Sequence, residues 1–567
     1  MQQAIPWIHS YPAGVHWDAP LPVASVPQLL SDAAARWPER HALEFMGKAI
    51  TYRELQQQVD RATLGLQRLG VGHGVHVGLF LPNTPHYVIS FFAILQAGGT
   101  VVNYSPLDAE KVLHHKIEDS QTDFLITLDM QTLYPQMGKM LQDTRLKKLI
   151  IGSIAEVSAH PDAVRAHLTQ AGQLAAIPQD ELHLSFAQLL DNDGSYQPQA
   201  ATDPVNTIAV LQYTGGTTGL PKGAMLTHAN LTAACSQIIE TTHTVPPLLS
   251  EGEERVLVVL PLFHIYALTV DMLFGLKLGA ELVLHARFDV EAVMHDLAHK
   301  KITVFPGVPT MYTAIIQHPK AAELDLRSLK FCNSGGAPLP QEVQQKFEAL
   351  TGCQLLEGWG MTETSPTGTF TPVSVARRPG SCGVPAPGIR FRFVSIDDGE
   401  SDVAPGERGE ICVAGPNIMK GYWKQPEATR KAFTHDGYFR TGDVGYMDAD
   451  GFVYIVDRTK DMILSGGYNV YPRNIEEAIY QHPAVAEVSV IGIPDAYRGQ
   501  AAKVFIKLKA GQAALDFEAL KVFLADKLGK HEMPVALEVR AELPKTPVGK
   551  LSKKELYEEE AKKRAAG

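Results

Sequence analysis

The sequence predicts an α/β protein, with a large N-terminal domain of doubly wound sheets plus a small β-barrel-like part, followed by a small α+β C-terminal domain. Three observations support this prediction. Strand and helix patterns alternate over the first part of the chain, short runs separated by turn clusters occupy residues 389–456, and a compact mixed pattern follows residue 458. Regular alternation of strand and helix is typical of a mainly parallel sheet covered by helices.

The alternation is clearest in residues 51–103. Thr51 and Glu54 form a capping-box pattern, apolar residues recur at helical spacing through residue 69, and Gly70 suits the position after a helix. A buried strand is predicted over 75–81, a second helix over 85–97 and a second strand over 100–103. Residues 189–206 are polar and rich in turn formers, so we expect a loop there.

The pattern changes from residue 389 onward. Turn clusters at 397–399 and 448–451 split the short runs, which predicts antiparallel strands. Beyond Arg458 we expect helices over 472–481 and 517–528, and strands over 485–493 and 502–508. These changes suggest an N-terminal domain of residues 1–457, a connection at 458–461 and a C-terminal domain of residues 462–567.

The composition is ordinary for a globular protein, with 45% hydrophobic and 20% charged residues. A net charge of −11 gives no support for nucleic-acid binding. The five cysteines form no CxxC pair, which favours reduced thiols and no zinc site. No secretory signal is recognisable, and charged residues interrupt the most apolar stretch, 256–284. We therefore expect a cytoplasmic protein, and peripheral contact with the inner face of the membrane stays open.

Residues 213–223 read Tyr-Thr-Gly-Gly-Thr-Thr-Gly-Leu-Pro-Lys-Gly and follow a strand-like run. Small residues let backbone N–H groups approach phosphate oxygens, while the threonine hydroxyls and Lys222 add donors and positive charge. The loop is not a Walker A motif, because Lys222 lies between Pro221 and Gly223. We predict that it binds phosphate through Lys222 and the preceding run of Thr214, Gly215, Gly216, Thr217, Thr218 and Gly219.

This loop resembles the signature loop of the adenylate-forming superfamily, which includes acyl-CoA synthetases, luciferases and the adenylation domains of peptide synthetases. Further motifs similar to those of the superfamily follow in the same order, at 260–266, 333–338, 357–363, 438–443, 457–461, 465–469 and 544–550. The hinge segment 456–465 and the N-terminal Trp7, Tyr11 and Pro12 most resemble bacterial long-chain fatty-acid–CoA ligases. The resemblance implies a mobile C-terminal domain.

The resemblance also implies the nucleotide site. Trp359 would stack on adenine, Asp443 would accept hydrogen bonds from the ribose hydroxyls, and Thr362 would contact a phosphate oxygen. Glu363 would bind Mg²⁺, with Thr214 close to the same ion. The other residues expected around the nucleotide are Gly335, Gly336, Ala337, Pro338, Glu357, Gly358, Gly360, Met361, Ile455 and Arg458.

The remaining roles come from the same resemblance. Lys550, Lys222 and His264 are expected to be catalytic, and Lys460 is expected to be the residue about which the C-terminal domain rotates. Coenzyme A would be guided by Gly466, Gly467 and Tyr468. The acyl pocket would be lined by His264, Leu268, Val308 and Met311.

These residues predict an enzyme that uses ATP and Mg²⁺ to activate a fatty acid as acyl-AMP and then forms acyl-CoA, AMP and pyrophosphate. In the superfamily, domains that activate amino acids usually carry an aspartate for the ammonium group just after the phenylalanine of the 260–266 motif. Here Phe263 is followed by His264, so the resemblance disfavours amino acids as substrates. Medium-chain or aryl acids, and an acyl-AMP ligase that loads a carrier protein, stay open as alternatives. A non-catalytic nucleotide or lipid binder is disfavoured by Lys222, Glu363 and Lys550.

Overall fold

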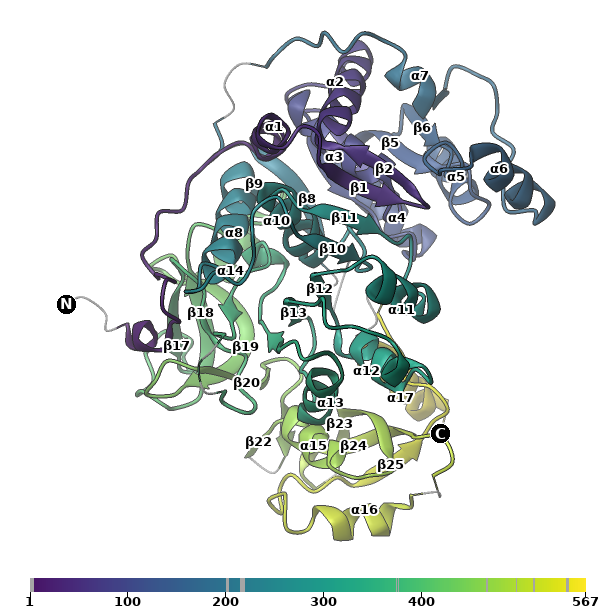
Figure 1. Cartoon of the computed structure of the whole chain (residues 1–567). Helices are drawn as coiled ribbons and strands as arrows, with labels where there is room; N and C mark the ends of the chain where they lie inside the picture. Colours follow the sequence, from purple (N-terminus) through teal and green to yellow (C-terminus); the bar gives the residue numbers. More distant parts are fainter. Residues whose placement is uncertain are drawn as a thin grey trace.

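The computed structural model describes residues 5–199, 203–214, 220–373, 375, 377–465, 468–495, 497–512, 515–546 and 550–566. Two seven-stranded, mainly parallel sheets form the upper and central parts of the molecule (Figure 1). The first has the order β7-β6-β5-β3-β4-β8-β9, with strands His183–Ser185, Lys148–Gly152, Thr122–Leu128, His76–Leu79, Thr100–Asn103, Ile208–Thr214 and Lys222–Thr227. The second has the order β14-β13-β12-β10-β11-β1-β2, with strands Leu355–Glu357, Phe331–Ser334, Val304–Gly307, Arg255–Val258, Glu281–Leu284, His41–Phe45 and Lys48–Thr51.

Helices connect these strands, and most of them share one continuous hydrophobic core with the sheets. They are α1 Val26–Arg36, α2 Tyr52–Arg68, α3 Pro85–Gln96, α4 Glu110–Ser120, α5 Tyr134–Asp143, α6 Pro161–Gln170, α7 Phe186–Leu190, α8 His228–Thr241, α9 Ile265–Ala267, α10 Phe274–Leu278, α11 Val290–His299, α12 Pro309–Gln317 and α13 Gln341–Thr351. A π-helix, η2 (Leu268–Leu273), joins α9 to α10. Short 3₁₀ turns, η1, η3 and η4, cover Pro6–Ser10, Ala321–Glu323 and Thr362–Thr364.

An antiparallel sheet of four strands, β17-β18-β19-β20, lies beside the parallel sheets. Its strands are Arg390–Val394, Gly409–Ala414, Phe439–Met447 and Val453–Arg458, and helix α14 (Pro426–Ala432) precedes β19. A two-stranded ribbon, β15-β16 (Thr369–Phe370 and Val384–Pro385), accompanies it. This antiparallel unit is the small β part that the turn clusters predicted.

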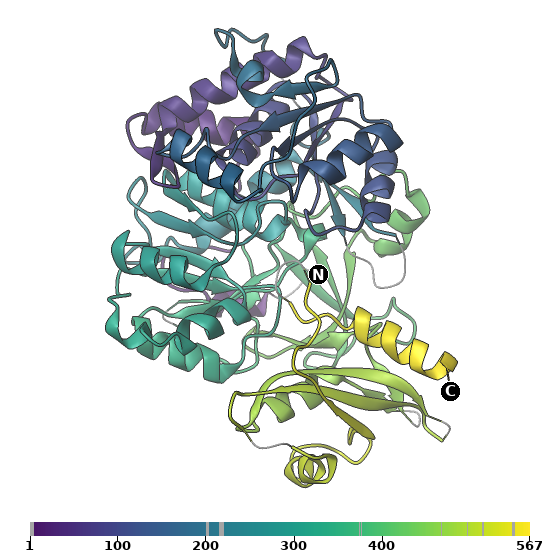
Figure 2. The same cartoon turned by 90° about the vertical axis from the view of Figure 1, so that its right-hand side faces the viewer.

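A smaller α+β unit follows β20 and forms the lower part of Figures 1 and 2. Its sheet contains β21 Ile463–Ser465, β22 Tyr468–Val470, β23 Val485–Asp495, β24 Gly499–Leu508 and β25 Ala536–Val539. Its helices are α15 Pro472–Tyr480, α16 Phe517–Leu524 and α17 Lys554–Ala566. This unit has a hydrophobic core of its own, built around Ile463, Ile475 and Val504.

The predicted fold class is confirmed, and several elements match in detail. Helix α2 begins with the predicted capping box, in which Glu54 N–H donates to Thr51 Oγ1 and the Glu54 carboxylate accepts from Thr51 N–H. The predicted helix over 517–528 is wrong at its end. The α-helix ends at Leu524, because the backbone tightens there into three-residue turns, in which Ala525 N–H bonds to the carbonyl of Val522.

The apolar stretch 256–284 forms β10, the helical run α9–η2–α10 and β11, almost all of it buried. Among the described residues, no helix is both long enough and apolar enough to cross a bilayer. The prediction that this stretch is a core element is confirmed.

Candidate active site

A cavity of about 690 Å³ lies where the two parallel sheets, the antiparallel sheet and the smaller unit meet. Thr214 ends β8, Gly335 follows β13 and Gly358 follows β14, so the carboxyl ends of parallel strands supply much of its wall. The structure brings fourteen of the predicted residues to this wall: Thr214, Lys222, His264, Gly335, Gly336, Gly358, Trp359, Gly360, Met361, Thr362, Glu363, Arg458, Lys460 and Lys550.

Lys550 reaches the cavity from the smaller unit and lies directly on the turn after β13. A Cβ atom on Gly336 would be 2.2 Å from Lys550 Cε and 2.5 Å from its Nζ, and Gly336 has φ +80°. Burial, with a contribution from the nearby charge of Arg458, lowers the pKa of Lys550 to about 8. The ammonium form therefore still predominates at neutral pH.

His264 lies on the same cavity. Its Nδ1 accepts a hydrogen bond of 3.2 Å from Tyr266 N–H, so the neutral ring carries its proton on Nε2. Burial, and then the charge of Lys550, lower the pKa of His264 to about 3. His264 is thus a neutral imidazole that can donate one hydrogen bond from Nε2.

Trp359 and Arg458 are linked through Asp443 on β19. Trp359 Nε1–H donates to Asp443 Oδ2 over 2.8 Å, and Arg458 Nε lies 3.1 Å from Asp443 Oδ1. Asp443 is 3% exposed and does not line the cavity itself. Each carboxylate oxygen keeps a second acceptor position, so these contacts leave it able to accept further hydrogen bonds.

Glu363 has the environment of a carboxylate beside a cation site. Tyr422 O–H donates to Glu363 Oε1 over 2.8 Å, and Lys222 Nζ lies 5.2 Å from the centre of the Tyr422 ring. Burial raises the pKa of Glu363, which disfavours its charged form unless a positive charge approaches. No cluster of three His, Cys, Asp or Glu side chains suited to a metal occurs in the described ranges. The residues fit Mg²⁺, which commonly takes one or two carboxylates together with substrate phosphates.

Several predicted residues lie elsewhere. Gly215, Gly216, Thr217, Thr218, Gly219, Gly466 and Gly467 are outside the described residues. Ala337, Pro338, Glu357 and Ile455 do not line the cavity, although Ala337 and Glu357 adjoin lining residues in sequence. Tyr468 is exposed on β22, with its ring 5.0 Å from that of His531.

The prediction for the acyl pocket stays untested, and of its residues only His264 lines this cavity. Leu268, Val308 and Met311 are at most 8% exposed and pack in the core instead of lining the cavity. After His264 the chain winds as a short α-helix and then as a π-helix, whose wider turn changes which side chains share a face. The apolar side chains that do reach the cavity include Ile238, Ile265, Val270, Phe331 and Leu356. Val270 lies in the π-helix, for which the sequence carries no signal, and the other four lie on separate elements whose meeting at the cavity depends on the tertiary structure.

Two tyrosines of the site were also missed as functional residues. Tyr266 O–H donates to the backbone carbonyl of Asn333 over 2.9 Å, and its ring would be 2.8 Å from a Cβ atom on Gly335. Tyr266 lies inside a recognised motif and could have been selected, whereas Tyr422, the partner of Glu363, has no motif around it.

Comparison with known proteins agrees with the sequence motifs. Residues 30–423 match the family described as AMP-binding enzyme, and residues 474–550 match the AMP-binding enzyme C-terminal domain. A long-chain-fatty-acid–CoA ligase of Bacillus subtilis (strain 168) is 41% identical over 99% of both chains. A long-chain-fatty-acid–CoA ligase of Salmonella typhimurium is 36% identical over 98% of both chains.

A solved structure supports the same relationship. An anthranilate–CoA ligase in complex with anthranoyl-AMP superposes with a TM-score of 0.83 at 25% sequence identity, and the match covers 96% of this chain and 99% of the other.

Proposed function

The chain belongs to the AMP-binding enzyme family, and we propose that its substrate is a long-chain fatty acid. The enzyme activates the acid with ATP as acyl-AMP and then transfers the acyl group to coenzyme A, releasing AMP. The observation that carries this proposal is the meeting of Lys550, Lys222 and His264 on one cavity that also has an apolar wall.

In the first step, a carboxylate oxygen of the acid attacks the α-phosphorus of ATP. A new P–O bond forms, the bond to the bridging oxygen breaks, and pyrophosphate leaves. Such reactions depend mainly on positioning and on stabilising negative charge. We assign the charge stabilisation to the ammonium groups of Lys550 and Lys222, and the positioning of the carboxylate to the Nε2–H of His264. Bound Mg²⁺, held by Glu363 near Thr214, would offset charge on the phosphates.

In the second step, the thiol of coenzyme A attacks the acyl carbonyl and the C–S bond forms. The C–O bond to the phosphate breaks, AMP leaves, and the thiol proton is released to solvent. The Lys550 side chain fills part of the cavity in the present conformation, so the smaller unit must move to admit the thiol. We propose that residues 1–457 act as the adenylation domain, 458–461 as the hinge around Lys460, and 462–567 as the C-terminal domain that carries Lys550. The separate sheet and core of the smaller unit support this division. Gly466, Gly467 and Tyr468 would guide the pantetheine arm.

A long acyl chain suits the apolar wall of the cavity, because each buried CH₂ group contributes about 0.8 kcal/mol. The unpaired state of all five cysteines supports a reducing compartment, and we propose the cytoplasm. Long-chain acids partition into membranes, so we propose that the enzyme collects its substrate at the inner face of the membrane.

The decisive experiment measures pyrophosphate release with ATP and Mg²⁺ for acids from acetate to oleate and for benzoate, with and without coenzyme A. We expect the highest rate with long chains and continuous turnover only when coenzyme A is present. A maximum with aryl acids, as the similarity to the anthranilate ligase would allow, would keep the mechanism and replace the substrate. Pyrophosphate release without consumption of coenzyme A would point to a carrier-protein acceptor.

The Lys550→Ala variant tests the role of the lysine in the same assay. Removing one preorganised charge donor commonly costs about 10²–10³ in rate, so we expect a loss of that size in adenylation. Formation of the thioester from supplied acyl-AMP should change far less. An equal loss in both half-reactions would contradict the assignment of Lys550.

A further inference from the structure

The carboxylate of Asp457 joins the two units of the molecule beside the proposed hinge. Asp457 lies in β20, three residues before Lys460, and is 7% exposed. Its Oδ1 accepts the N–H of Arg458 over 2.7 Å, and its Oδ2 accepts the N–H of Arg473 over 3.0 Å. Arg473 belongs to the first turn of α15, so one carboxylate holds the last strand before the hinge against the first helix after it.

Lys553 connects the loop that carries Lys550 (residues 544–552) to the region around Asp457. It follows Lys550 by three residues, and its Nζ lies 3.0 Å from Glu476 Oε1, which also accepts the N–H of Val490 over 2.8 Å. Burial favours the neutral form of Lys553, but Glu476 and Asp457 outweigh it and raise its pKa above the ordinary value. The ammonium group therefore forms an ion pair with Glu476, which follows the hinge, and is attracted by the charge of Asp457, which precedes it.

Hydrogen bonds between residues 544–546 and 550–552 close the loop that carries Lys550, immediately before Lys553. Thr546 N–H donates to the carbonyl of Lys550 over 2.6 Å, and Ser552 N–H donates to that of Pro544 over 2.8 Å. Lys550 N–H donates to Thr546 Oγ1 over 3.2 Å. Because the loop is closed in this way, a displacement of Lys553 moves Lys550 with it.

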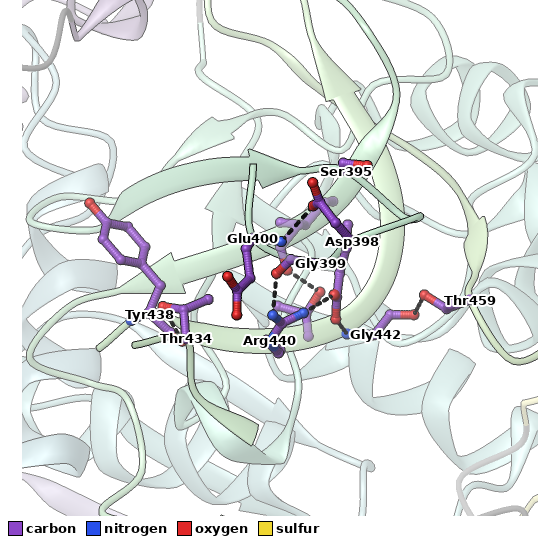
Figure 3. Close-up of polar contacts among 12 residues, drawn as sticks. Ser395, Asp398, Gly399, Glu400, Thr434, Tyr438, Arg440, Gly442 and Thr459 are labelled. Atoms are coloured by element: carbon purple, nitrogen blue, oxygen red, sulfur yellow. Dashed lines mark hydrogen bonds and ion pairs between the residues drawn. The ribbon is translucent and has the colours of Figure 1, made fainter. Parts of the chain in front are cut away.

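The residue before Lys460 is fixed to the large unit. Thr459 donates to the carbonyl of Gly442 both from its N–H, over 2.9 Å, and from its Oγ1, over 3.1 Å (Figure 3). Gly442 adjoins Asp443, and Figure 3 shows this contact on β19, the same strand from which Arg440 donates to the carbonyl of Gly399. Rotation at Lys460 would therefore leave Asp457 with the large unit and carry Arg473 and Lys553 away from it.

We propose that Asp457 and Lys553 are positioning residues, which hold the smaller unit in the orientation that places Lys550 against Gly336. The inference rests on the proposed two-step reaction. It assigns the pair to the adenylation step alone, because the hydrogen bond from Arg473 N–H to Asp457 crosses the hinge and Lys553 belongs to the part that rotates. Their arrangement must therefore change when the smaller unit turns for thioester formation.

The test compares Asp457→Asn and Lys553→Met in the two half-reactions, with whichever acid the wild type activates best. Misplacing a catalytic group by about 1 Å can cost up to about 100-fold, so we expect adenylation to fall by about 10- to 100-fold. Thioester formation from supplied acyl-AMP should be unchanged or faster. Lys554→Met is the matched control, because this neighbouring lysine is exposed and lies 3.9 Å from its nearest carboxylate, on Glu558. Equal losses in both half-reactions, or no loss in either, would overturn the proposal.

A second measurement needs no substrate. The amide hydrogen of Arg473 is donated to Asp457. It should exchange with solvent faster in Lys553→Met than in Lys554→Met. Equal exchange in the two variants would also overturn the proposal. Absence of pyrophosphate release from the wild type with every acid would instead contradict the proposed function.

Discussion

Burial lowers the pKa values of His264 and Lys550 in the same cavity, yet it leaves them with different charges. The pKa of His264 falls to about 3, so the ring is neutral at physiological pH, while that of Lys550 falls to about 8, so most of the lysine stays charged. A neutral donor and a cation lie side by side as a result. This combination suits an anionic substrate whose carboxylate must be oriented without losing its nucleophilic oxygen to protonation.

Another buried ionisable residue, Asp271, has a carboxyl group without a hydrogen-bond partner among the described residues. Asp271, on the π-helix η2, is 0% exposed, and neither of its carboxylate oxygens has a hydrogen-bond partner among the described residues. Burial raises the pKa of Asp271 well above its ordinary value, so the folded protein holds it protonated. Above pH of about 4 the unfolded chain ionises this group and the folded chain does not, which lowers the free energy of unfolding as pH rises.

We therefore expect Asp271→Leu, which keeps the branched shape, to be more stable than the wild type by about 1–3 kcal/mol at pH 7. The gain should shrink toward pH 4, where the unfolded carboxyl is also protonated. Urea unfolding at about pH 4.5, 6 and 8 measures the difference in the free energy of unfolding between the variant and the wild type. The lowest of these values is close to the ordinary pKa of a carboxyl group, and the other two lie above it. Asp32→Leu on the exposed face of α1 is the control and should show no such pH dependence. A pH-independent gain would contradict the protonated state.

At the scale of elements, the turn between β13 and α13 decides where Lys550 can lie. Gly336 adopts φ +80°, and its missing side chain leaves the space that the lysine occupies. The turn thus provides both the backbone geometry and the room for a group that comes from the other unit.

Gly336→Ala should displace Lys550 and lower adenylation by up to about 100-fold, while thioester formation from acyl-AMP is much less affected. Gly70→Ala is a matched control, because Gly70 has φ +88° but nothing lies within 4 Å of an added Cβ atom. It carries similar backbone strain without the clash. Comparable losses of adenylation in both variants would show that strain, and not the contact with Lys550, is responsible.

Prediction at this scale succeeded where the signal is local. The capping box at Thr51 and the proline at Pro472 begin helices because the groups that satisfy a helix end are close in sequence. The end of α16 and the π-helix at 268–273 were missed, since both depend on how the backbone is packed by other elements.

At the scale of the whole molecule, the proposed reaction needs two arrangements of the units around one cavity. Lys460→Pro should impair thioester formation more than adenylation, because a proline fixes φ near −65°. Where the rotated backbone conflicts with that value the cost is about 3 kcal/mol, or roughly 100-fold. Separate half-reaction assays measure the two effects. Lys460→Ala removes the charge but leaves the backbone free, so it should retain thioester formation, and a similar defect in both variants would argue against a hinge at this residue.

The sequence by itself determined the family and its chemistry. Lys222, Trp359, Glu363, Asp443 and Lys550 stand in short motifs, and each motif is recognisable because the groups that would meet ATP impose residue types locally. The alternation of strands and helices likewise predicted mainly parallel sheets covered by helices, because apolar periodicity reports burial along a single element.

Only the tertiary structure decided which distant groups meet. Lys550 lies against Gly336, Asp443 joins Trp359 to Arg458, and Val270 rather than Leu268 reaches the cavity. The pKa values of His264 and Lys550 follow from the same burial. These features depend on the faces that separate elements turn toward each other, and sequence spacing along one element carries no information about that choice.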